Sequence, residues 1–305
     1  MPELPDIIVY REALEQRTLG ATLTSIRLGN PFLLRSVFPQ PSEATGRNVV
    51  GLRRLGKRIV FQLEGDMFLV LHLMIAGRLH WKPSGVKIPG KIGLAAFDFT
   101  SGTLTLTEAG TKKRASLNIV AGEENLKALD RGGMDIENGT EAEFAGRLTL
   151  ENHTLKRALT DPRLFSGIGN SYSDEILHRA KLSPLRLTRQ MTNEEIGMLF
   201  RSVKEVFSEW TERLRKEAGD EFPEHVTAFR KAMAVHGKFN LPCPVCGTKV
   251  QRIVYAENEC NYCPRCQTGG KLLADRAFSR LLKNDWPKTI EELEAGSRLK
   301  GVESQ

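Results

Sequence analysis

The sequence predicts a multidomain α+β protein, and three observations support this fold class. Residues 20–118 alternate short apolar runs with turn residues, a pattern typical of strands. From about residue 151, apolar residues recur at helical spacing. Two Cys-x2-Cys pairs near the C-terminal end indicate a small metal-bound module. We therefore divide the chain into a first domain at 1–130, a connector at 131–150, a helical domain at 151–236, the cysteine module at 237–270 and a tail at 271–305.

The composition is that of an ordinary globular protein with an excess of basic residues. The 305 residues suffice for two or three domains, and 40% are hydrophobic and 27% charged. The net charge of +7 favours a polyanionic partner, nucleic acid first, although a merely basic protein is the alternative. We find no apolar run of roughly 18 residues and no secretory signal, so we expect no membrane contact, a cytoplasmic location and reduced cysteines.

The first domain is expected to begin with a short helix at 4–18, opened by Pro5. Two hairpins follow from turn signals. Glu64-Gly65-Asp66 separates strands at 59–61 and 67–73, and Ser101-Gly102 separates strands at 97–99 and 103–107. Residues 82–93 carry two prolines and three glycines and are expected to form a loop. Residues 119–150, which include the connector, are polar and should contain at least one helix.

The helical domain carries two signals. Thr192 to Glu195 form a capping-box pattern that opens a periodic helix. Its apolar stripe predicts a face packed in the core, and consists of Ile196, Leu199, Phe200, Val203, Phe207, Trp210 and Leu214. Upstream, Gly167 and Gly169 precede Asn170, which we expect to cap a helix with Asp174 and Glu175 in its first turn. Such a helix start can bind phosphate, although a tight turn between helices is the default interpretation.

The cysteine module is predicted to hold one structural Zn²⁺. Cys243, Cys246, Cys263 and Cys266 would supply four thiolates, which leaves no open position for catalysis. Cys260 also forms a Cys-x2-Cys pair with Cys263 and is an alternative ligand. Residues 249–256 are rich in β-branched side chains and should form a hairpin between the two pairs. Zinc modules of this kind contact nucleic acid or protein.

Pro2 is the residue with the most unusual chemistry. An initiator methionine before proline is normally removed, which would leave a secondary amine at the chain start. Such an amine can add to an aldehyde-like carbon and form an iminium, and Glu3 is a candidate acid or base beside it. Many ordinary proteins also begin with Met-Pro, so this pattern needs support from the rest of the chain.

Three separated motifs together give that support. Pro2-Glu3-Leu4-Pro5, the segment from Leu159 to Glu175 and the four-cysteine module occur in the order seen in one family. The chain resembles the bacterial formamidopyrimidine-DNA glycosylase and endonuclease VIII family, as a divergent member, over residues 1 to about 270. The resemblance implies an N-terminal β-sandwich with an N-terminal helix, a helix–two-turn–helix domain and a C-terminal zinc-finger β-hairpin, with damaged double-stranded DNA held between them.

The resemblance also implies roles for single residues. Pro2 would attack C1′ of the damaged nucleotide, Glu3 would move protons, and Lys57 would contact phosphate beside the lesion. The flipped base would leave, and an iminium would allow β- and then δ-elimination. The residues expected at the DNA are His72, Lys112, Lys113, Lys156, Gly169, Asn170 and Asn258. Six basic residues are candidate phosphate contacts, namely Arg54, Lys57, Lys112, Lys113, Lys156 and Arg157. If about six contacts are real, log affinity should fall against log salt with a slope near −5.

The sequence departs from the family pattern at the residues that would read the lesion. Asn258 stands where the family has a zinc-finger arginine, and lacks its charge. Ile75, with Met74 beside it, aligns with the methionine that fills the gap left by the flipped base. The loop with Lys112 and Lys113 lacks the family's phenylalanine. Residues 217–236 would correspond to the family's lesion-capping loop.

The leading functional hypothesis is a monomeric, nucleoid-associated bifunctional DNA glycosylase and abasic-site lyase of base-excision repair. An oxidised or ring-opened purine is the favoured lesion, and an oxidised pyrimidine is the runner-up. A protein that binds damaged DNA without cutting it is an alternative of another class, because Asn258 replaces a key cation. A zinc-ribbon adaptor ranks last, since it leaves Pro2 and Glu3 unexplained.

Overall fold

The computed structural model describes residues 1–224, 226–255, 258–273 and 287–295. They form two compact units. The first contains residues 1–133 and 207–228, and the second contains 134–206 and 229–305. Helix α7 (Asn193–Ala218) therefore gives its first half to the second unit and its second half to the first. Residues 207–228 belong to the first unit although they follow part of the second unit in the sequence. Contiguous ranges therefore do not describe the two units.

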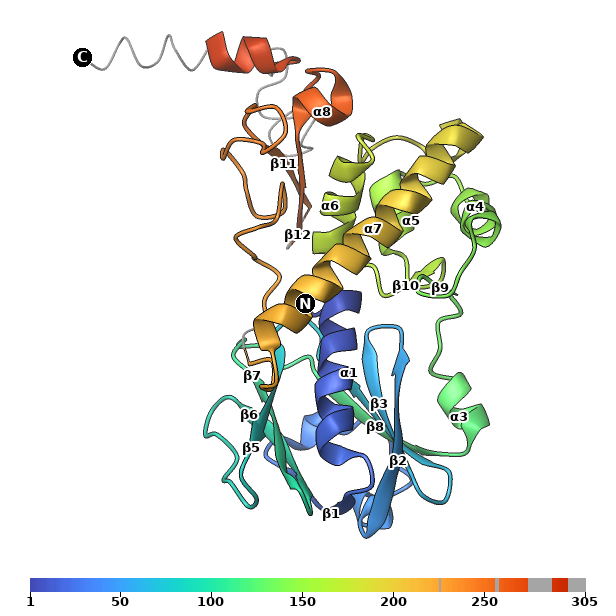
Figure 1. Cartoon of the computed structure of the whole chain (residues 1–305), viewed down its shortest axis with the longest axis vertical. Coiled ribbons are helices and arrows are strands. Elements are labelled where there is room, and N and C mark those ends of the chain that lie inside the picture. The colour runs from blue at the N-terminus through green and yellow to red at the C-terminus, as the bar shows by residue number, and fades with distance from the viewer. Residues whose placement is uncertain (225, 256–257, 274–286, 296–305) are drawn as a thin grey trace, which may run out of the picture. The chain divides into compact units, whose positions relative to one another are not determined.

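The first unit is a β-sandwich, as expected (Figure 1). Its eight strands are ordered β5-β7-β6-β1-β2-β3-β4-β8. Only two residue pairs join β1 to β2, so the sheet splits there into two four-stranded layers. The strands are β1 (Thr22–Leu28), β2 (Arg47–Leu55), β3 (Arg58–Leu63), β4 (Met67–His72), β5 (Gly77–Lys82), β6 (Gly93–Phe99), β7 (Gly102–Glu108) and β8 (Ser116–Ala121).

Both predicted hairpins are confirmed, and their turn residues explain them. Between β3 and β4, Gly65 has φ 71° and Asp66 has φ 56°, the left-handed geometry that tight hairpin turns require. Between β6 and β7, Gly102 has φ 153°, and a Cβ there would lie 2.6 Å from the ring of Trp81. The loop expected at 82–93 connects β5 to β6.

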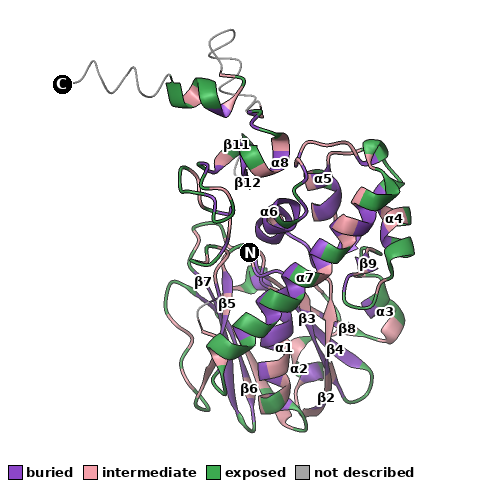
Figure 2. Ribbon diagram, turned by 45° about the horizontal axis from the view of Figure 1, so that its top comes forward, coloured by how far each residue is buried: buried purple, intermediate pink, exposed green. Residues whose placement is uncertain are grey.

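The N-terminal helix α1 (Leu4–Thr18) has the predicted bounds and lies against β2 and β3. Residues Leu4 to Tyr10 are all buried, as the purple start of this helix in Figure 2 shows. An apolar core between the layers accounts for this burial, and it contains Ile7, Tyr10 and Leu14 of the helix. The helix thereby fixes the start of the chain against the sandwich.

The late segment 219–228 completes this core. Phe222 and Val226 are 8% and 7% exposed and belong to the same apolar cluster. The ring of Phe222 lies 5.7 Å from that of Tyr10. Glu224 contacts Nδ1 of His80 and lies 3.1 Å from Nζ of Lys82. The described residues of 219–228, which belong to the segment 217–236 expected to correspond to the lesion-capping loop, are therefore anchored on the first unit by burial and by charge.

Short elements and the second unit account for the remaining described residues. The first unit also has η1 (Pro31–Leu33), α2 (Pro41–Ala44) and α3 (Glu123–Lys127). The second unit has β9 (Met134–Asp135), α4 (Glu141–Thr149), α5 (Leu155–Thr160), β10 (Phe165–Ser166), α6 (Asn170–Arg179), η2 (Thr188–Gln190), β11 (Gln251–Tyr255), β12 (Asn258–Tyr262) and α8 (Pro264–Thr268). The connector contains helices, as expected.

The capping box before α7 is confirmed. The Thr192 N–H donates to Glu195 Oε2 at 2.9 Å, and the Glu195 N–H donates to Thr192 Oγ1 at 3.2 Å. The hairpin of the cysteine module differs from the prediction, because residues 249–256 supply only its first strand and β12 supplies the second.

The tail also differs from its predicted pattern. Leu272 and Leu273 are not helical, and the Leu272 N–H donates to the carbonyl of Lys288 at 2.8 Å. The helical residues of the described tail are 290–295. Phe278, Leu281 and Leu282, on which the helical expectation rested, lie outside the described residues. A search of the described part of the chain finds no helix with the length and apolar character needed to cross a membrane.

Candidate active site and zinc module

The start of the chain is held in a buried, charged setting on the first unit. Pro2 is buried, and Glu3, which is 1% exposed, caps α1. The Glu3 N–H donates to Asp6 Oδ2 at 2.9 Å, so the first turn of the helix fixes both carboxylates. Burial lowers the pKa of the ammonium group on Met1, the carboxylates of Glu3 and Asp6 oppose this, and the cations of Arg78 and Lys57 reinforce it.

Lys57 and His72 belong to the same region. Lys57 lies in the two-residue turn between β2 and β3, and Gly56 before it has φ 63°. His72 ends β4 and pairs with Arg58 of β3. Burial, followed by the charges of Arg58, Lys57 and Arg131, lowers the pKa of His72 to about 4. His72 is therefore neutral at pH 7 and sits among cations, a setting suited to a polyanion.

The two residues proposed to fill the gap of a flipped base lie on one tight turn. The Gly77 N–H donates to the carbonyl of Leu73 at 2.9 Å and closes this turn. A Cβ on Gly77 would lie 2.3 Å from that carbonyl oxygen, so only glycine fits. Met74 has φ 51°, and Ile75 is 49% exposed at the tip. Ile75 is therefore the better placed of the two to act as a wedge.

Lys112 and Lys113 lie in the loop between β7 and β8. The buried carboxylate of Glu108 organises this loop, because its Oε2 accepts the N–H groups of Arg114 at 2.8 Å and Ala115 at 3.1 Å. Nζ of Lys113 donates to the carbonyl of Glu108, whereas Lys112 is exposed. Lys112 is thus available to a phosphate.

Lys156 is placed differently from the expectation. Its Nζ donates to the carbonyl of Asn170 at 2.7 Å, to Ser173 Oγ at 2.8 Å and to Asp174 Oδ1 at 2.6 Å. An ammonium group has three hydrogens, and these bonds use all of them. We therefore leave Lys156 out of the proposed phosphate contacts and regard it as a buried partner of Asp174.

The glycine turn also needs a correction of one residue. Gly169, not Asn170, caps α6, and Gly167 has φ 95°. Asp174 and Glu175 are buried beyond the first turn instead of facing the helix start. Asn170 Nδ2 donates to the carbonyl of Glu259 at 3.0 Å, which ties α6 to β12. Asn258 is exposed at the start of β12.

The four predicted cysteines come together as a metal site. Their Sγ atoms all lie within 4.8 Å of one another. The Sγ atoms of Cys243 and Cys266 are 3.9 Å apart, and those of Cys246 and Cys263 are 3.4 Å apart. Sulfurs at about 2.3 Å from a tetrahedral Zn²⁺ would be about 3.8 Å apart, so the residues fit this ion. Nε2 of His178 lies 3.2 Å from Cys243 Sγ and supports the ligand.

Cys260 is not part of this cluster. It lies on β12 with 1% of its surface exposed, and burial raises the pKa of its thiol. The alternative ligand set that includes Cys260 is excluded because the four sulfurs that cluster are those of Cys243, Cys246, Cys263 and Cys266.

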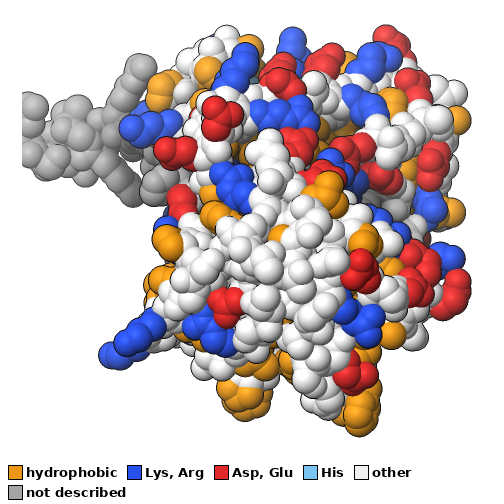
Figure 3. Space-filling model, turned by 60° about the horizontal axis from the view of Figure 1, so that its bottom comes forward, with side chains coloured by type: hydrophobic (Ala, Val, Ile, Leu, Met, Phe, Trp, Pro, Cys, Tyr) orange, Lys and Arg blue, Asp and Glu red, His pale blue; other side chains and the backbone are white. Residues whose placement is uncertain are grey.

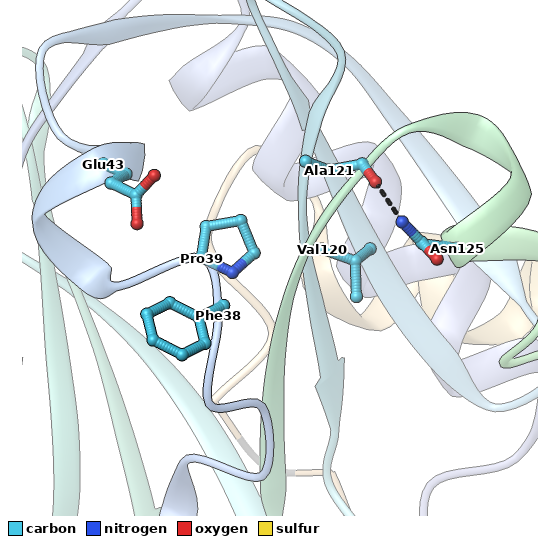
Figure 4. A pocket seen from close by; sticks show the side chains of 6 residues that line it. All are labelled: Phe38, Pro39, Glu43, Val120, Ala121 and Asn125. Carbon is cyan, nitrogen blue, oxygen red and sulfur yellow. Dashed lines mark hydrogen bonds between the residues drawn. The ribbon is translucent and has the colours of Figure 1, made fainter.

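One pocket lies apart from all of these residues. It has a volume of about 440 Å³ and is lined by Phe38, Pro39, Glu43, Val120, Ala121 and Asn125, which Figure 4 shows. Asn125 Nδ2 donates to the carbonyl of Ala121 at its edge, at 2.7 Å. None of the predicted site residues lines it, so we assign it no role. On the face in Figure 3, basic and acidic side chains are interspersed, so the net charge is not gathered there.

Sequence reasoning missed three residues of the first unit. The charge of Arg78 lowers the pKa of the N-terminal ammonium, and the charge of Arg131 lowers the pKa of His72. Glu224 anchors the late segment through its contact with Lys82. Alternation along β5 places Arg78 and His80 on one face, but no motif marks either. Their roles follow only from strands and segments that are distant in the sequence.

Three family models match the chain in order. The N-terminal domain of formamidopyrimidine-DNA glycosylase matches residues 1–116, its H2TH domain matches 134–218, and the zinc finger found in FPG and IleRS matches 240–269. The tail at 271–305 lies beyond them.

Individual relatives agree with these models. A formamidopyrimidine-DNA glycosylase of Thermus thermophilus is 33% identical over 280 residues, covering 88% of this chain and 100% of the relative. The structure of Lactococcus lactis Fpg with DNA containing an abasic site has a TM-score of 0.77 at 26% identity, covering 87% of this chain and 99% of that one. MutM with DNA containing carbocyclic 8-oxo-G has the same TM-score and identity, covering 88% and 100%. The chain belongs to the formamidopyrimidine-DNA glycosylase family.

Proposed function

We propose that the chain is a bifunctional DNA glycosylase and abasic-site lyase whose nucleophile is the amine of Pro2, exposed by removal of Met1. The observation that carries the proposal is the setting of the chain start. A buried amino terminus lies beside the carboxylate of Glu3 and the cations of Arg78 and Lys57. A packing role alone does not require an acid and two cations around a terminal amine.

The proposed reaction follows from those groups. The Pro2 nitrogen attacks C1′, the bond from C1′ to the base breaks, and the base leaves with a proton. The Pro2 nitrogen then loses its proton and expels the ring oxygen O4′ from C1′, O4′ takes up a proton, and the resulting iminium acidifies the C2′ proton. Loss of that proton expels the 3′ phosphate, and a second elimination expels the 5′ phosphate. Glu3 would carry protons between these steps, because it is fixed beside the amine by the first turn of α1.

Lys57 and His72 would hold the backbone beside the reacting sugar. A neutral histidine can donate one hydrogen bond to a phosphate oxygen, and Lys57 supplies charge. Ile75 would enter the space that the flipped base leaves. Lys112, Asn170 and Gly169 are further proposed contacts, and an oxidised or ring-opened purine is the favoured lesion.

One observation favours a second candidate, a protein that binds damaged DNA without cutting it. Asn258 is exposed and uncharged, and the guanidinium of Arg252 on the neighbouring strand lies 3.2 Å from Glu259 Oε2 and stacks on Phe239. The zinc finger therefore offers less positive charge at this hairpin than an arginine at position 258 would give.

Borohydride trapping on a duplex with one abasic site separates the two candidates. The wild-type chain, shown by mass spectrometry to begin at Pro2, should give a covalent adduct that maps to Pro2. A version with extra residues before Pro2 is the matched control, because its proline nitrogen is an amide and should give none. Absence of a wild-type adduct, or an equal adduct in Pro2→Gly, would contradict the lyase proposal.

A lesion panel tests the finer part of the proposal. Duplexes carrying a ring-opened purine, an oxidised purine or an oxidised pyrimidine are compared in single-turnover assays. Fastest release of a purine lesion is expected. Fastest release of the pyrimidine lesion would overturn the preference and leave the chemistry intact.

A further inference from the structure

We propose that Arg78 is a positioning residue of this site, which keeps a positive charge beside the terminal amine and holds the turn that carries Met74 and Ile75. The inference rests on the proposed function, and it concerns a residue that no sequence motif marks. Arg78 lies on β5, directly after the turn at 73–77. Its charge acts on the N-terminal ammonium, and its side chain bonds to the turn that carries the proposed wedge.

The hydrogen bonds of Arg78 support the second part of this role. Its Nη1 donates to the carbonyl of Gly77 at 2.7 Å and reaches the carbonyl of Ile75 at 3.4 Å. Both carbonyls belong to the tight turn whose tip is Ile75. A planar guanidinium can hold two such carbonyls in one fixed arrangement, which a flexible ammonium group does less well.

The charges around the amine support the first part. Four groups from three elements act on the ammonium of Met1, namely Glu3 and Asp6 at the start of α1, Lys57 in the β2–β3 turn and Arg78 on β5. Of the two cations, Arg78 lowers the pKa of this ammonium more than Lys57 does. The Pro2 nitrogen is one residue further along, about 3.8 Å by Cα spacing, so it lies in the same field.

Tyr10 gives an independent indication of where Arg78 lies. The Tyr10 hydroxyl is buried, and the Leu79 N–H donates to it at 3.4 Å. Burial raises the pKa of Tyr10, and among the neighbouring charges Arg78 opposes this shift while Asp6 and Glu224 reinforce it. The charges of Arg78 and Asp6 therefore act on both Tyr10 and the N-terminal ammonium, and the hydrogen bond from Leu79 places β5 beside α1.

A cation beside an amine favours the neutral form, which is the nucleophile. Removal of the Arg78 charge raises the pKa of the amine, so a higher pH is needed to deprotonate it. The acid limb of adduct formation should therefore move to higher pH. This shift concerns the rate of the covalent step and not the affinity for DNA.

The test is single-turnover borohydride trapping on abasic-site DNA, with enzyme saturating and pH varied, on chains shown to begin at Pro2. Arg78→Gln keeps hydrogen-bond donors and loses the charge, and its acid limb should move to higher pH. Lys57→Gln should move it the same way by less. Lys127→Gln removes the same unit charge from an exposed site paired with Glu124, and should leave the limb in place.

Arg78→Lys separates charge from geometry. The acid limb should return to that of the wild type, while the plateau rate at high pH stays below it, because a flexible ammonium group holds the two turn carbonyls less rigidly than Nη1 of a planar guanidinium. An unmoved limb in Arg78→Gln, or a displaced limb in Arg78→Lys at unchanged thermal stability, would overturn the inference. Absence of any wild-type adduct would instead refute the proposed function itself, so the two failures are distinguishable.

Discussion

Nδ1 of His236 lies 2.8 Å from Oδ2 of Asp174, and the other oxygen of the same carboxylate lies 2.6 Å from Nζ of Lys156. The Asp174 carboxylate is fully buried, and the Asn261 N–H also donates to Oδ2 at 3.1 Å. One carboxylate on α6 therefore holds α5, the segment before the zinc module and strand β12. This buried charge therefore links three segments of the second unit.

Replacement of that charge should destabilise the second unit strongly. Asp174→Asn leaves the Lys156 ammonium buried without its counter-ion, a change that typically costs about 3–5 kcal/mol. Hydrogen exchange of the α6 amides measures the free energy of local opening. Asp161→Asn is the matched control, because its partner Arg163 is exposed and such pairs contribute about 0–1 kcal/mol. Equal effects of the two variants would refute this account.

The same carboxylate gives a pH dependence with a definite sign. Burial opposes ionisation of Asp174, but Lys156 and His236 outweigh it and hold the pKa below its ordinary value of 3.8. Stability from this group is therefore present above pH 3.8 and lost as the pH falls through the lower folded-state pKa. The opening free energy of α6 should fall in this acid range, and Asp174→Asn should lack that component of the fall.

Phe222 should matter more to the first unit than the charged contact beside it. Phe222→Ala empties a buried site and should lower the free energy of unfolding by about 3 kcal/mol. Glu224→Gln removes a half-exposed ion pair and should cost about 1 kcal/mol or less. Urea unfolding, followed through tryptophan fluorescence, measures both. Phe38→Ala, at a site 74% exposed in the same unit, should be nearly neutral.

The assignment of the zinc ligands predicts a clear difference between cysteines. Cys243→Ser should lose the metal, since three thiolates bind Zn²⁺ less tightly than four. Cys260→Ala should keep one Zn²⁺ per chain, because its sulfur lies outside the cluster. Metal analysis by plasma mass spectrometry measures the content. A zinc-free Cys260→Ala chain would show that the ligand set is wrong.

A positive charge at position 258 should strengthen DNA binding. Asn258→Arg adds one potential phosphate contact, so the plot of log affinity against log salt should steepen by about 0.9. Asn258→Gln is the matched control, with a longer side chain and no charge, and should leave the slope unchanged. With Lys156 withdrawn from six candidate contacts, five remain, and the wild-type slope should be about −4.5. An arginine variant with the wild-type slope would place position 258 away from the DNA.

The parts of the fold that sequence could predict are those set by local chemistry. The α1 bounds followed from Pro5 and the apolar pattern, the two hairpins from glycine turns, and the α7 start from a capping box. The zinc ligands followed from two repeats of Cys-Pro-x-Cys, a pattern that the pair of Cys260 and Cys263 does not share. In each case, neighbouring residues determine the structure.

The parts that it could not predict depend on distant partners. The sequence indicates a surface cation at Lys156, beside Arg157. In the structure, Nζ of Lys156 bonds to the buried carboxylate of Asp174. Arg78 and Glu224 belong to no motif. The charge of Arg78 acts on Met1, and Glu224 contacts Lys82, and both relationships join residues that are distant in the sequence. The cap of α6 moved by one residue because Gly169 can take the extended conformation that precedes a helix as readily as Asn170.

The return of residues 207–228 to the first unit sets an order of events during synthesis. A ribosome that has completed residue 133 has made every strand of the sandwich, but not Phe222 or Val226 of its core. At ordinary elongation rates these residues follow roughly 5 to 20 s later. Until these residues are synthesised, part of the apolar interior of the nascent sandwich is uncovered. Chaperones that bind such surfaces can act during this interval.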